Sequence, residues 1–180
     1  MEMTLKEIEN EIKNCKTCRK DKKGLPVPGE GPSDAGAMFI GMAPGKKESE
    51  TGRPFVGRAG KFLNEMLESI GINREDVYIT SPVKYYPGDR NLRKEEIRHG
   101  AEHLKKQIEV LSPELVVLMG DVAAEAVFPE KDIKVTEDHG KTYRKEGTTY
   151  FVTFHPAAGM RFPKIRKMMK KDFQKIASLA

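Results

Sequence analysis

A glutamate and a histidine stand out in the sequence because each lies close behind an apolar run that predicts a strand. Glu48 lies four residues after Pro44, at the end of a turn of small residues, where a carboxylate can orient or deprotonate a water molecule. His155 directly follows the largely apolar run Tyr150–Phe154, where an imidazole can donate a hydrogen bond to an anion developing on a leaving group. Each has a plainer interpretation: a surface glutamate beside two lysines, and a structural histidine. Which interpretation holds depends on what the fold places around them.

The turn before Glu48 spans residues 41–45 and has the sequence Gly-Met-Ala-Pro-Gly. Its two glycines let backbone amides approach a ligand closely, and its proline stiffens the chain. Neither the dinucleotide-binding pattern GxGxxG nor the phosphate-binding pattern GxxxxGK followed by Ser or Thr occurs. The turn is therefore predicted to hold a ligand through its backbone, and a nucleotide cofactor is not expected.

A loop rich in glycine and proline follows at residues 51–60, and its single aromatic side chain is Phe55. A flat ring at the mouth of a pocket can stack on a nucleobase. Arg53 and Arg58 flank this ring and can contact phosphates. The alternative is that Phe55 anchors the loop beneath its own turn.

Basic residues are concentrated at the end of the sequence. The 180 residues have a net charge of +5, whereas the last twenty contain seven Lys or Arg against one Asp and carry +6. Positive charge gathered in this way suits a polyanionic partner such as nucleic acid. The alternative is the solvated face of a terminal helix.

Apolar runs that alternate with helical stripes predict the elements that position these residues. Buried strands are predicted at residues 37–42, 77–80, 115–120 and 150–154. Helices are predicted over about residues 5–14, 59–70, 97–111, 121–128 and 163–179. Apolar strands that alternate with helices are typical of a parallel sheet covered on both faces. We therefore expect a single α/β domain over residues 1–180, a three-layer α/β/α sandwich with a central four-stranded parallel sheet.

Ligands of such sheets bind beyond the carboxyl ends of the strands, where the connecting loops converge. The four predicted loops at that edge begin at Gly41, Ser81, Gly120 and His155. The first and last of these carry the unusual residues, so a working site is expected there.

Composition limits the remaining classes. Apolar residues make up 38% of the chain, and no apolar run approaches the roughly 18 to 20 residues that cross a bilayer. The first residues do not resemble a secretory signal, so we expect a cytoplasmic protein without a membrane partner. Cys15 and Cys18 are too few for a disulfide scaffold and are spaced like a metal-binding or redox pair.

Four segments together resemble the family four uracil-DNA glycosylases: GMAPGKKESETGRPFVGRAGKFLNEML, DVYITSPVK, LVVLMGDVAAEAV and FHPAAGMR. The resemblance covers nearly the whole chain, and GRPFVGRAG is its most specific part. It implies the uracil-DNA glycosylase fold. It also implies a monofunctional enzyme of base excision repair that hydrolyses the N-glycosidic bond of uracil, or of a related deaminated base, in DNA.

The resemblance further implies roles for individual residues. Glu48 is linked to activation of the attacking water, and His155 stabilises negative charge on the carbonyl oxygen of the base. In relatives the loop after this histidine enters the minor groove as a wedge, for which Met160 is the apolar candidate. The residues expected to bind the base are Gly41, Met42, Ala43, Gly45, Phe55 and Ser81, and those expected to bind DNA are Arg53, Arg58, Met160, Arg161 and Lys164.

The sequence departs from this family at its metal site. Relatives hold an iron-sulfur cluster with four cysteines, of which this chain has Cys15 and Cys18; Tyr85 stands at the third position and the fourth falls at about Gly100. Two thiolates cannot hold a cubane cluster alone. We therefore expect the cluster to be lost and no cofactor to be bound.

A residual metal site is the alternative at this place. It would use Cys15 and Cys18 with His99 or His103, since zinc accepts mixed cysteine and histidine ligands.

A second departure concerns the base. Relatives carry asparagine after YIT, and its amide reads the uracil edge, whereas this chain has the shorter Ser81. Met42 also replaces a commonly acidic residue. The alternatives are therefore a glycosylase for another base, such as hypoxanthine or xanthine, and a DNA-binding protein of this fold without catalysis. A further alternative, an RNA-binding module, is supported only by the basic residues at the end of the sequence. We expect a monomer whose partner is DNA, double- or single-stranded.

Overall fold

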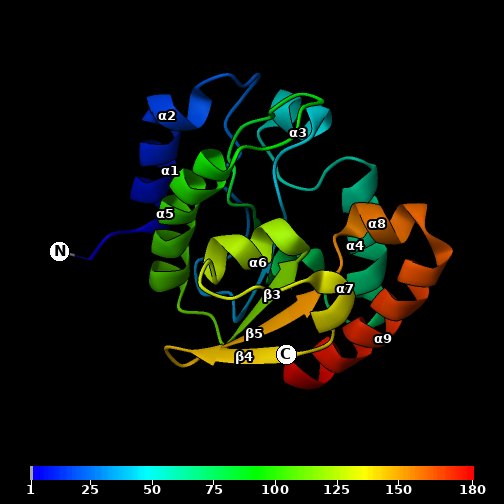
Figure 1. Ribbon diagram of the computed structural model, residues 1–180. Coiled ribbons are helices and arrows are strands. Elements are labelled where there is room, and N and C mark those ends of the chain that lie inside the picture. The colour runs from blue at the N-terminus through cyan, green and yellow to red at the C-terminus, as the bar shows by residue number, and fades with distance from the viewer. Residues whose placement is uncertain (1) are drawn as a thin grey trace.

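The computed structural model describes residues 2–180, and a five-stranded sheet lies at its centre (Figure 1). The strands are β1 (Ala37–Ile40), β2 (Tyr78–Thr80), β3 (Leu115–Met119), β4 (Thr142–Lys145) and β5 (Thr148–Thr153). Their order is β2-β1-β3-β5-β4; the first four run parallel, and β4 runs antiparallel to β5. The expectation of a four-stranded parallel sheet is therefore wrong in one respect, because the sheet is mixed and has a fifth strand.

The fifth strand escaped the sequence analysis because β4 is an edge strand with the polar sequence Thr-Tyr-Arg-Lys. Its residues alternate between exposed and half-buried, so it lacks the apolar run that marked the others. A two-residue turn, Glu146 and Gly147, joins β4 to β5, and both residues have positive φ, 50° and 86°. Such a turn matches the twist of a hairpin. The charged edge also protects the sheet from pairing with other chains.

Helices cover both sides of the sheet (Figure 1). They are α1 (Leu5–Asn14), α2 (Lys16–Arg19), α3 (Lys46–Thr51), α4 (Arg58–Ser69), the 3-10 turn η1 (Arg74–Asp76), α5 (Lys94–Leu111), α6 (Asp121–Val127), α7 (Val135–Asp138), α8 (Pro156–Arg161) and α9 (Pro163–Leu179). Helices α1, α5 and α6 pack together on one side, and α4, α8 and α9 pack together on the other. The α/β class and the five helices expected from the sequence, which correspond to α1, α4, α5, α6 and α9, are confirmed; α2, α3, α7 and α8 were not expected.

The core lies between the sheet and these helices. Strands β1, β2 and β3 are buried along their whole length, which explains their continuous apolar sequences. Helix α9 turns Met169, Phe173 and Ile176 inward, and the ring of Phe173 lies 6.2 Å from that of Phe39 on β1. Because one stripe of α9 is buried, its basic residues remain on the outer face.

The carboxyl ends of the parallel strands meet at one edge, as expected. The amide of Gly41 donates to Thr80 at 2.9 Å, and the amide of Gly120 donates to Thr153 at 2.9 Å. Gly120 has φ +101°, and a Cβ there would lie 3.3 Å from Cβ of His155. The loops after all four strands are therefore drawn together at this edge. None of the helices over residues 2–180 combines the length and the apolar sequence of a membrane span.

Candidate active site

A cavity of about 200 Å³ opens at this edge of the sheet. It is smaller than the roughly 300 to 1,000 Å³ of pockets for drug-sized ligands, which suits a single heterocycle. Seven of the residues expected at the site line it: Ala43, Gly45, Glu48, Phe55, Arg58, Ser81 and His155. Pro44, which was expected only to stiffen the turn, also lines the cavity, and four lining residues were not singled out from the sequence: Val27, Pro54, Gly57 and Ala59. Three of the four belong to the GRPFVGRAG segment, so its motif was the available signal.

Glu48 lies in the first turn of α3 and is only 9% exposed. Its Oε1 accepts hydrogen bonds from the backbone amides of Val56 at 3.0 Å and Gly57 at 2.9 Å. Its Oε2 faces Gly45, where an added Cβ would lie 2.7 Å away. The interpretation as a surface glutamate is therefore wrong. One carboxylate oxygen is held by the loop, and the other makes no hydrogen bond within residues 2–180.

His155 follows β5 and caps the start of α8. Its Nδ1 accepts a hydrogen bond from the amide of Ala157 at 3.1 Å, so in the neutral ring the proton resides on Nε2. Burial lowers the pKa of His155 to about 4, because a charged ring would lose solvation. At neutral pH the ring is therefore neutral and presents Nε2–H as a donor, which lies close to Gly41, where an added Cβ would be 3.5 Å from Nε2.

Phe55 forms one wall of the cavity, with its ring centroid 5.6 Å from that of His155. The edge of the ring packs on Gly41, where an added Cβ would lie 2.6 Å from Cζ. Phe55 has φ 50°, a left-handed conformation that is unfavourable for a bulky residue. Something outside the loop must therefore hold this conformation.

That holding residue is Arg74, which the sequence analysis missed. Its guanidinium donates to the carbonyl oxygens of Pro54 and Phe55 and, at 3.2 Å, to Oδ1 of Asn64. Burial lowers the pKa of Arg74. The loop also packs directly on Gly60 of α4. Only glycine fits there, because an added Cβ would lie 1.8 Å from the Phe55 carbonyl oxygen. The loop is thus fixed from two sides, and no sequence pattern linked Arg74 to it.

Ser81 and Met42 are less suited to reading a ligand through their side chains. Ser81 is buried, and its hydroxyl donates to the carbonyl of Val83 at 2.7 Å, so the backbone already takes its single proton. The side chain of Met42 is 42% exposed and does not line the cavity. Ligand contacts at these positions would therefore come mainly from backbone groups.

The arginines of the loop differ in their availability. Arg53 donates from Nε and Nη2 to the carboxylate of Glu30, at 2.7 and 3.1 Å, and lies outside the cavity. Arg58, at the start of α4, lines both the cavity and a neighbouring groove between α4, α8 and α9. Arg58 is therefore the better placed of the two to contact a phosphate beside the site.

Met160 and Phe162 lie where α8 meets α9. Met160 is half-buried, packs against the core and lines the groove with Arg58. Phe162 is 50% exposed and separates the two helices. Arg166 holds this corner by donating to the carbonyls of Gly159 at 3.1 Å and Met160 at 2.9 Å. Arg161 and Lys164 are exposed on either side of Phe162. The apolar side chain that projects here is thus Phe162, which the sequence analysis did not single out.

The two cysteines lie where α1 meets α2, close to two histidines of α5. The ligand atoms of Cys15, Cys18, His99 and His103 all lie within 4.8 Å of one another. Tyr85 is buried nearby, and its hydroxyl reaches the Lys13 carbonyl at 3.5 Å. The cluster therefore consists of two thiols and two imidazoles.

Comparisons with known proteins agree with this architecture. The model of the uracil DNA glycosylase superfamily matches residues 28–177. The chain is 39% identical to a type-4 uracil-DNA glycosylase of Archaeoglobus fulgidus, covering 98% of this chain and 93% of that protein. It is 37% identical to the type-4 enzyme of Sulfurisphaera tokodaii, covering 98% and 85% respectively. It is 34% identical to the type-4 enzyme of Thermotoga maritima, covering 95% and 92%.

Proposed function

The chain belongs to the uracil-DNA glycosylase superfamily, and from this premise we propose that it is a monofunctional DNA glycosylase of base excision repair. It hydrolyses the N-glycosidic bond of uracil, or of a related deaminated base, in DNA. The observation that carries the proposal is the convergence of Glu48, Phe55 and His155 on one cavity. Such an enzyme must rotate its nucleotide out of the duplex, which costs least for a mispaired base.

The base enters the cavity and stacks on Phe55, whose ring is held by the loop that Arg74 fixes. Cleavage of the glycosidic bond leaves the electron pair on the base. His155 donates from Nε2–H to the base oxygen on which this charge gathers. A neutral donor suits this task because its hydrogen bond strengthens as the oxygen becomes anionic, so the transition state gains more than the ground state.

Glu48 directs the water that completes the reaction. Its Oε1 is held by two backbone amides, so Oε2 has a defined position beside Gly45. From there Oε2 accepts a proton of a water that attacks C1′ of the sugar, whose developing positive charge the carboxylate also stabilises. No lysine lines the cavity within the described chain, and Lys46 and Lys47 are exposed. This supports hydrolysis by water, without a Schiff base to the enzyme.

The duplex lies across the corner of α8 and α9. Arg58, Arg161 and Lys164 contact phosphates there, and the exposed ring of Phe162 fills the space that the everted nucleotide leaves. Met160 supports this corner from below, since it is packed against the core. The basic outer face of α9 adds attraction for DNA that is independent of sequence.

With Ser81 the enzyme discriminates between bases less strictly than it would with an asparagine at this position. The Ser81 hydroxyl donates to Val83 and has no second proton for the base. We expect uracil to be the best substrate and hypoxanthine or xanthine to be weaker ones. Ser81→Asn is expected to increase the preference for uracil, measured as the ratio of excision rates.

The deciding experiment incubates the protein with labelled duplexes that contain uracil, hypoxanthine or xanthine opposite each base, followed by alkali. Breaks at uracil are expected with the natural protein and with Glu109→Gln, an exposed control on α5 whose side chain is 56% exposed. Glu48→Gln is expected to excise uracil much more slowly than the natural protein. If DNA is bound and no base is released, the protein is a binding module of this fold and the enzymatic proposal is wrong.

A further inference from the structure

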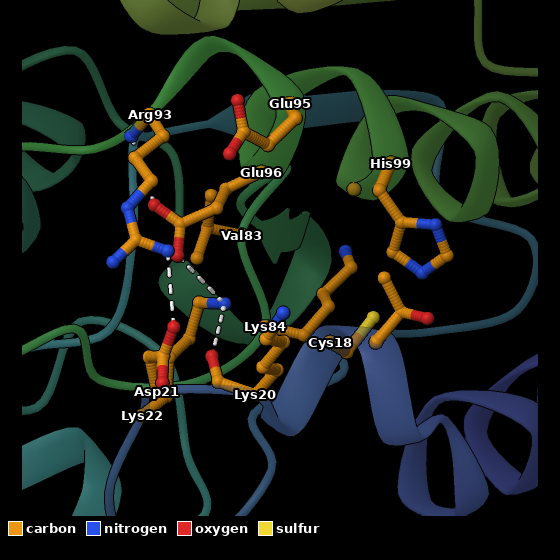
Figure 2. A pocket seen from close by; sticks show the side chains of 12 residues that line it. Cys18, Lys20, Asp21, Lys22, Val83, Lys84, Arg93, Glu95, Glu96 and His99 are labelled. Atoms are coloured by element: carbon orange, nitrogen blue, oxygen red, sulfur yellow. Dashed lines mark hydrogen bonds and ion pairs between the residues drawn. The ribbon is translucent and has the colours of Figure 1, made fainter.

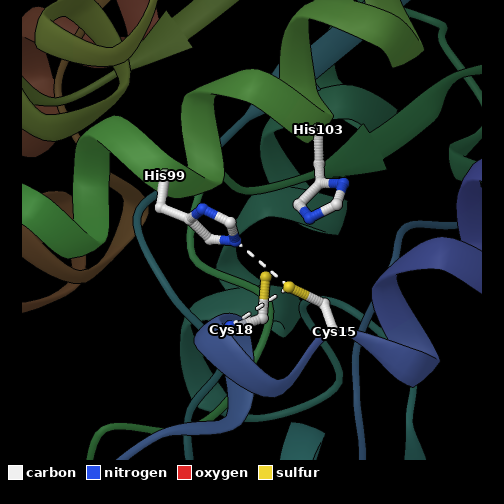
Figure 3. Close-up of side chains that lie close together, drawn as sticks. All are labelled: Cys15, Cys18, His99 and His103. Carbon is white, nitrogen blue, oxygen red and sulfur yellow. Dashed lines mark hydrogen bonds between the residues drawn. The ribbon is translucent and has the colours of Figure 1, made fainter.

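We propose that Cys15, Cys18, His99 and His103 bind one zinc ion, which joins the N-terminal helices to α5. Their four ligand atoms lie within 4.8 Å of one another, and Sγ of Cys15 is 3.1 Å from Nε2 of His99 (Figure 3). The residues come from two segments more than eighty positions apart. Only the packing of α1 and α2 on α5 brings them together (Figure 1).

Each pair is arranged by its own local structure. Cys15 ends α1 and caps α2, and its Sγ accepts a hydrogen bond from the amide of Cys18 at 3.4 Å. This turn aims both sulfurs at α5. His99 and His103 are four residues apart on α5, so their side chains share one face of the helix. A Cys-x2-Cys turn facing a His-x3-His helix is a spacing that tetrahedral zinc sites use.

His103 provides an independent sign that a ligand belongs here. Its side chain is buried to about nine-tenths, and neither ring nitrogen has a hydrogen-bond partner within the described residues. A buried polar group without a partner costs stability and calls for an explanation. In Figure 3 one nitrogen of the ring points toward the two sulfurs. An ion between the sulfurs and the imidazoles would satisfy that nitrogen.

Two carboxylates stand behind the histidines. Oε2 of Glu102 lies 3.9 Å from Nδ1 of His99, and Oε2 of Glu11 lies 3.9 Å from Nδ1 of His103. Lys106 holds Glu11 at 2.7 Å. Histidines that bind a metal through Nε2 usually direct Nδ1–H to such an oxygen, which sets their tautomer and orientation. Both Nδ1 atoms thus face outward to acids, which leaves Nε2 for the ion.

The donor set and its spacing select a single ion. A cubane iron-sulfur cluster takes four thiolates, and only two are present. Position 100 offers no room for another, because a Cβ there would lie 2.1 Å from the Pro82 carbonyl oxygen. A two-iron cluster with two histidines keeps its histidines and cysteines on different irons, whereas Cys15 and His99 are in direct contact.

Tetrahedral zinc is compatible with the observed spacing. Zn–S bonds of about 2.3 Å and Zn–N bonds of about 2.0 to 2.1 Å place the ligand atoms about 3.3 to 3.8 Å apart. The present cluster needs only small side-chain movements to reach these values. Binding displaces the two thiol protons to solvent, so that the ion and its two thiolates are neutral together.

The site also has an entry path. Cys18 and His99 line a cavity of about 170 Å³ that opens between α2 and the start of α5 (Figure 2). The same cavity is also lined by Lys22 and Glu96, which form an ion pair with Nζ 3.1 Å from Oε1. An ion can therefore reach the sulfurs from solvent without unfolding of α5.

The test measures metal in protein that carries no added histidines. Protein purified without chelators is expected to contain close to one equivalent of zinc, with little iron and no acid-labile sulfide. After removal of zinc, Co(II) is expected to give the visible bands of a tetrahedral site together with thiolate charge transfer. Cys18→Ser and His103→Phe are expected to lose both signals, and Lys105→Gln, whose side chain is 74% exposed on the same helix, is expected to keep them.

A second measurement covers variants that fail to fold. The natural apoprotein is titrated with zinc in competition with a chromophoric chelator. Its unfolding temperature is also measured with and without zinc, and must rise if zinc binds only the folded state. Iron with stoichiometric sulfide would overturn the proposal in favour of a cluster. A natural protein that holds no zinc and gives no tetrahedral Co(II) spectrum would also overturn it. Neither readout requires glycosylase activity.

Discussion

Replacing His155 tests both the catalytic assignment and the charge state from which it follows. His155→Ala removes the Nε2–H donor, and loss of one such donor typically lowers the rate of the chemical step by about 10² to 10³. His155→Gln retains a neutral amide donor and is expected to recover part of that loss. Excision is measured in single-turnover reactions with a uracil-containing duplex, so that product release does not mask the chemical step.

The low pKa of His155 also predicts that the free energy of unfolding falls on acidification, and that it falls less in His155→Ala. Burial lowers the pKa of His155 to about 4 in the folded protein, against 6.5 for an unperturbed histidine. As pH falls below 6.5, the unfolded chain therefore takes up a proton that the folded chain does not bind. Stability is therefore lost as pH falls toward 4. A difference of about 2.5 units corresponds to about 3 kcal/mol in total, of which about 2 kcal/mol is lost between about pH 7 and about pH 5.

Urea unfolding at these two pH values measures the effect. Other titrating groups are common to both proteins and cancel in the difference, so His155→Ala is expected to lose about 2 kcal/mol less than the natural protein on acidification. A neutral, buried His155 is refuted if both proteins lose the same stability on acidification. The neutral-donor assignment is also refuted if excision by the natural protein falls as pH rises past about 6.5 and His155→Ala abolishes this dependence, since that would require a charged ring.

Three further outcomes follow from the site. Glu48→Gln keeps an oxygen for the amides that hold the carboxylate but removes the base, so single-turnover excision is expected to fall by about 10² to 10⁴ with unchanged unfolding; an unchanged rate would exclude Glu48 from water activation. Gly60→Ala places a Cβ against the Phe55 carbonyl oxygen and is expected to cost about 1 to 3 kcal/mol in urea unfolding; full stability would show that the loop is not packed there. Replacing Arg161 and Lys164 together by glutamine is expected to remove two phosphate contacts, which lowers the slope of log K for DNA binding against log salt concentration by about 1.8. An unchanged slope in fluorescence titrations would place the DNA elsewhere.

Much of the fold was predictable because periodicity reports burial locally. The apolar run of β3 and the stripe of α9 that carries Met169 and Phe173 were both located from sequence alone. Strand β4 was not, because an edge strand needs no apolar run and Thr142–Lys145 has none. Its existence depends on pairing with β5, which supplies hydrogen-bond partners that the segment cannot find by itself.

The sequence by itself determined which residues were candidates for the site, since Glu48, Phe55 and His155 occupy motifs next to strand ends, and the ends of parallel strands meet at one edge. Only the tertiary structure decided what each candidate can do. The partners of the Glu48 carboxylate lie in the next loop, Arg74 reaches Phe55 from beyond α4, and Cys15 meets His99 across two helices. Such contacts join segments distant in the chain, and their geometry depends on how whole elements pack, which no local pattern of residues contains.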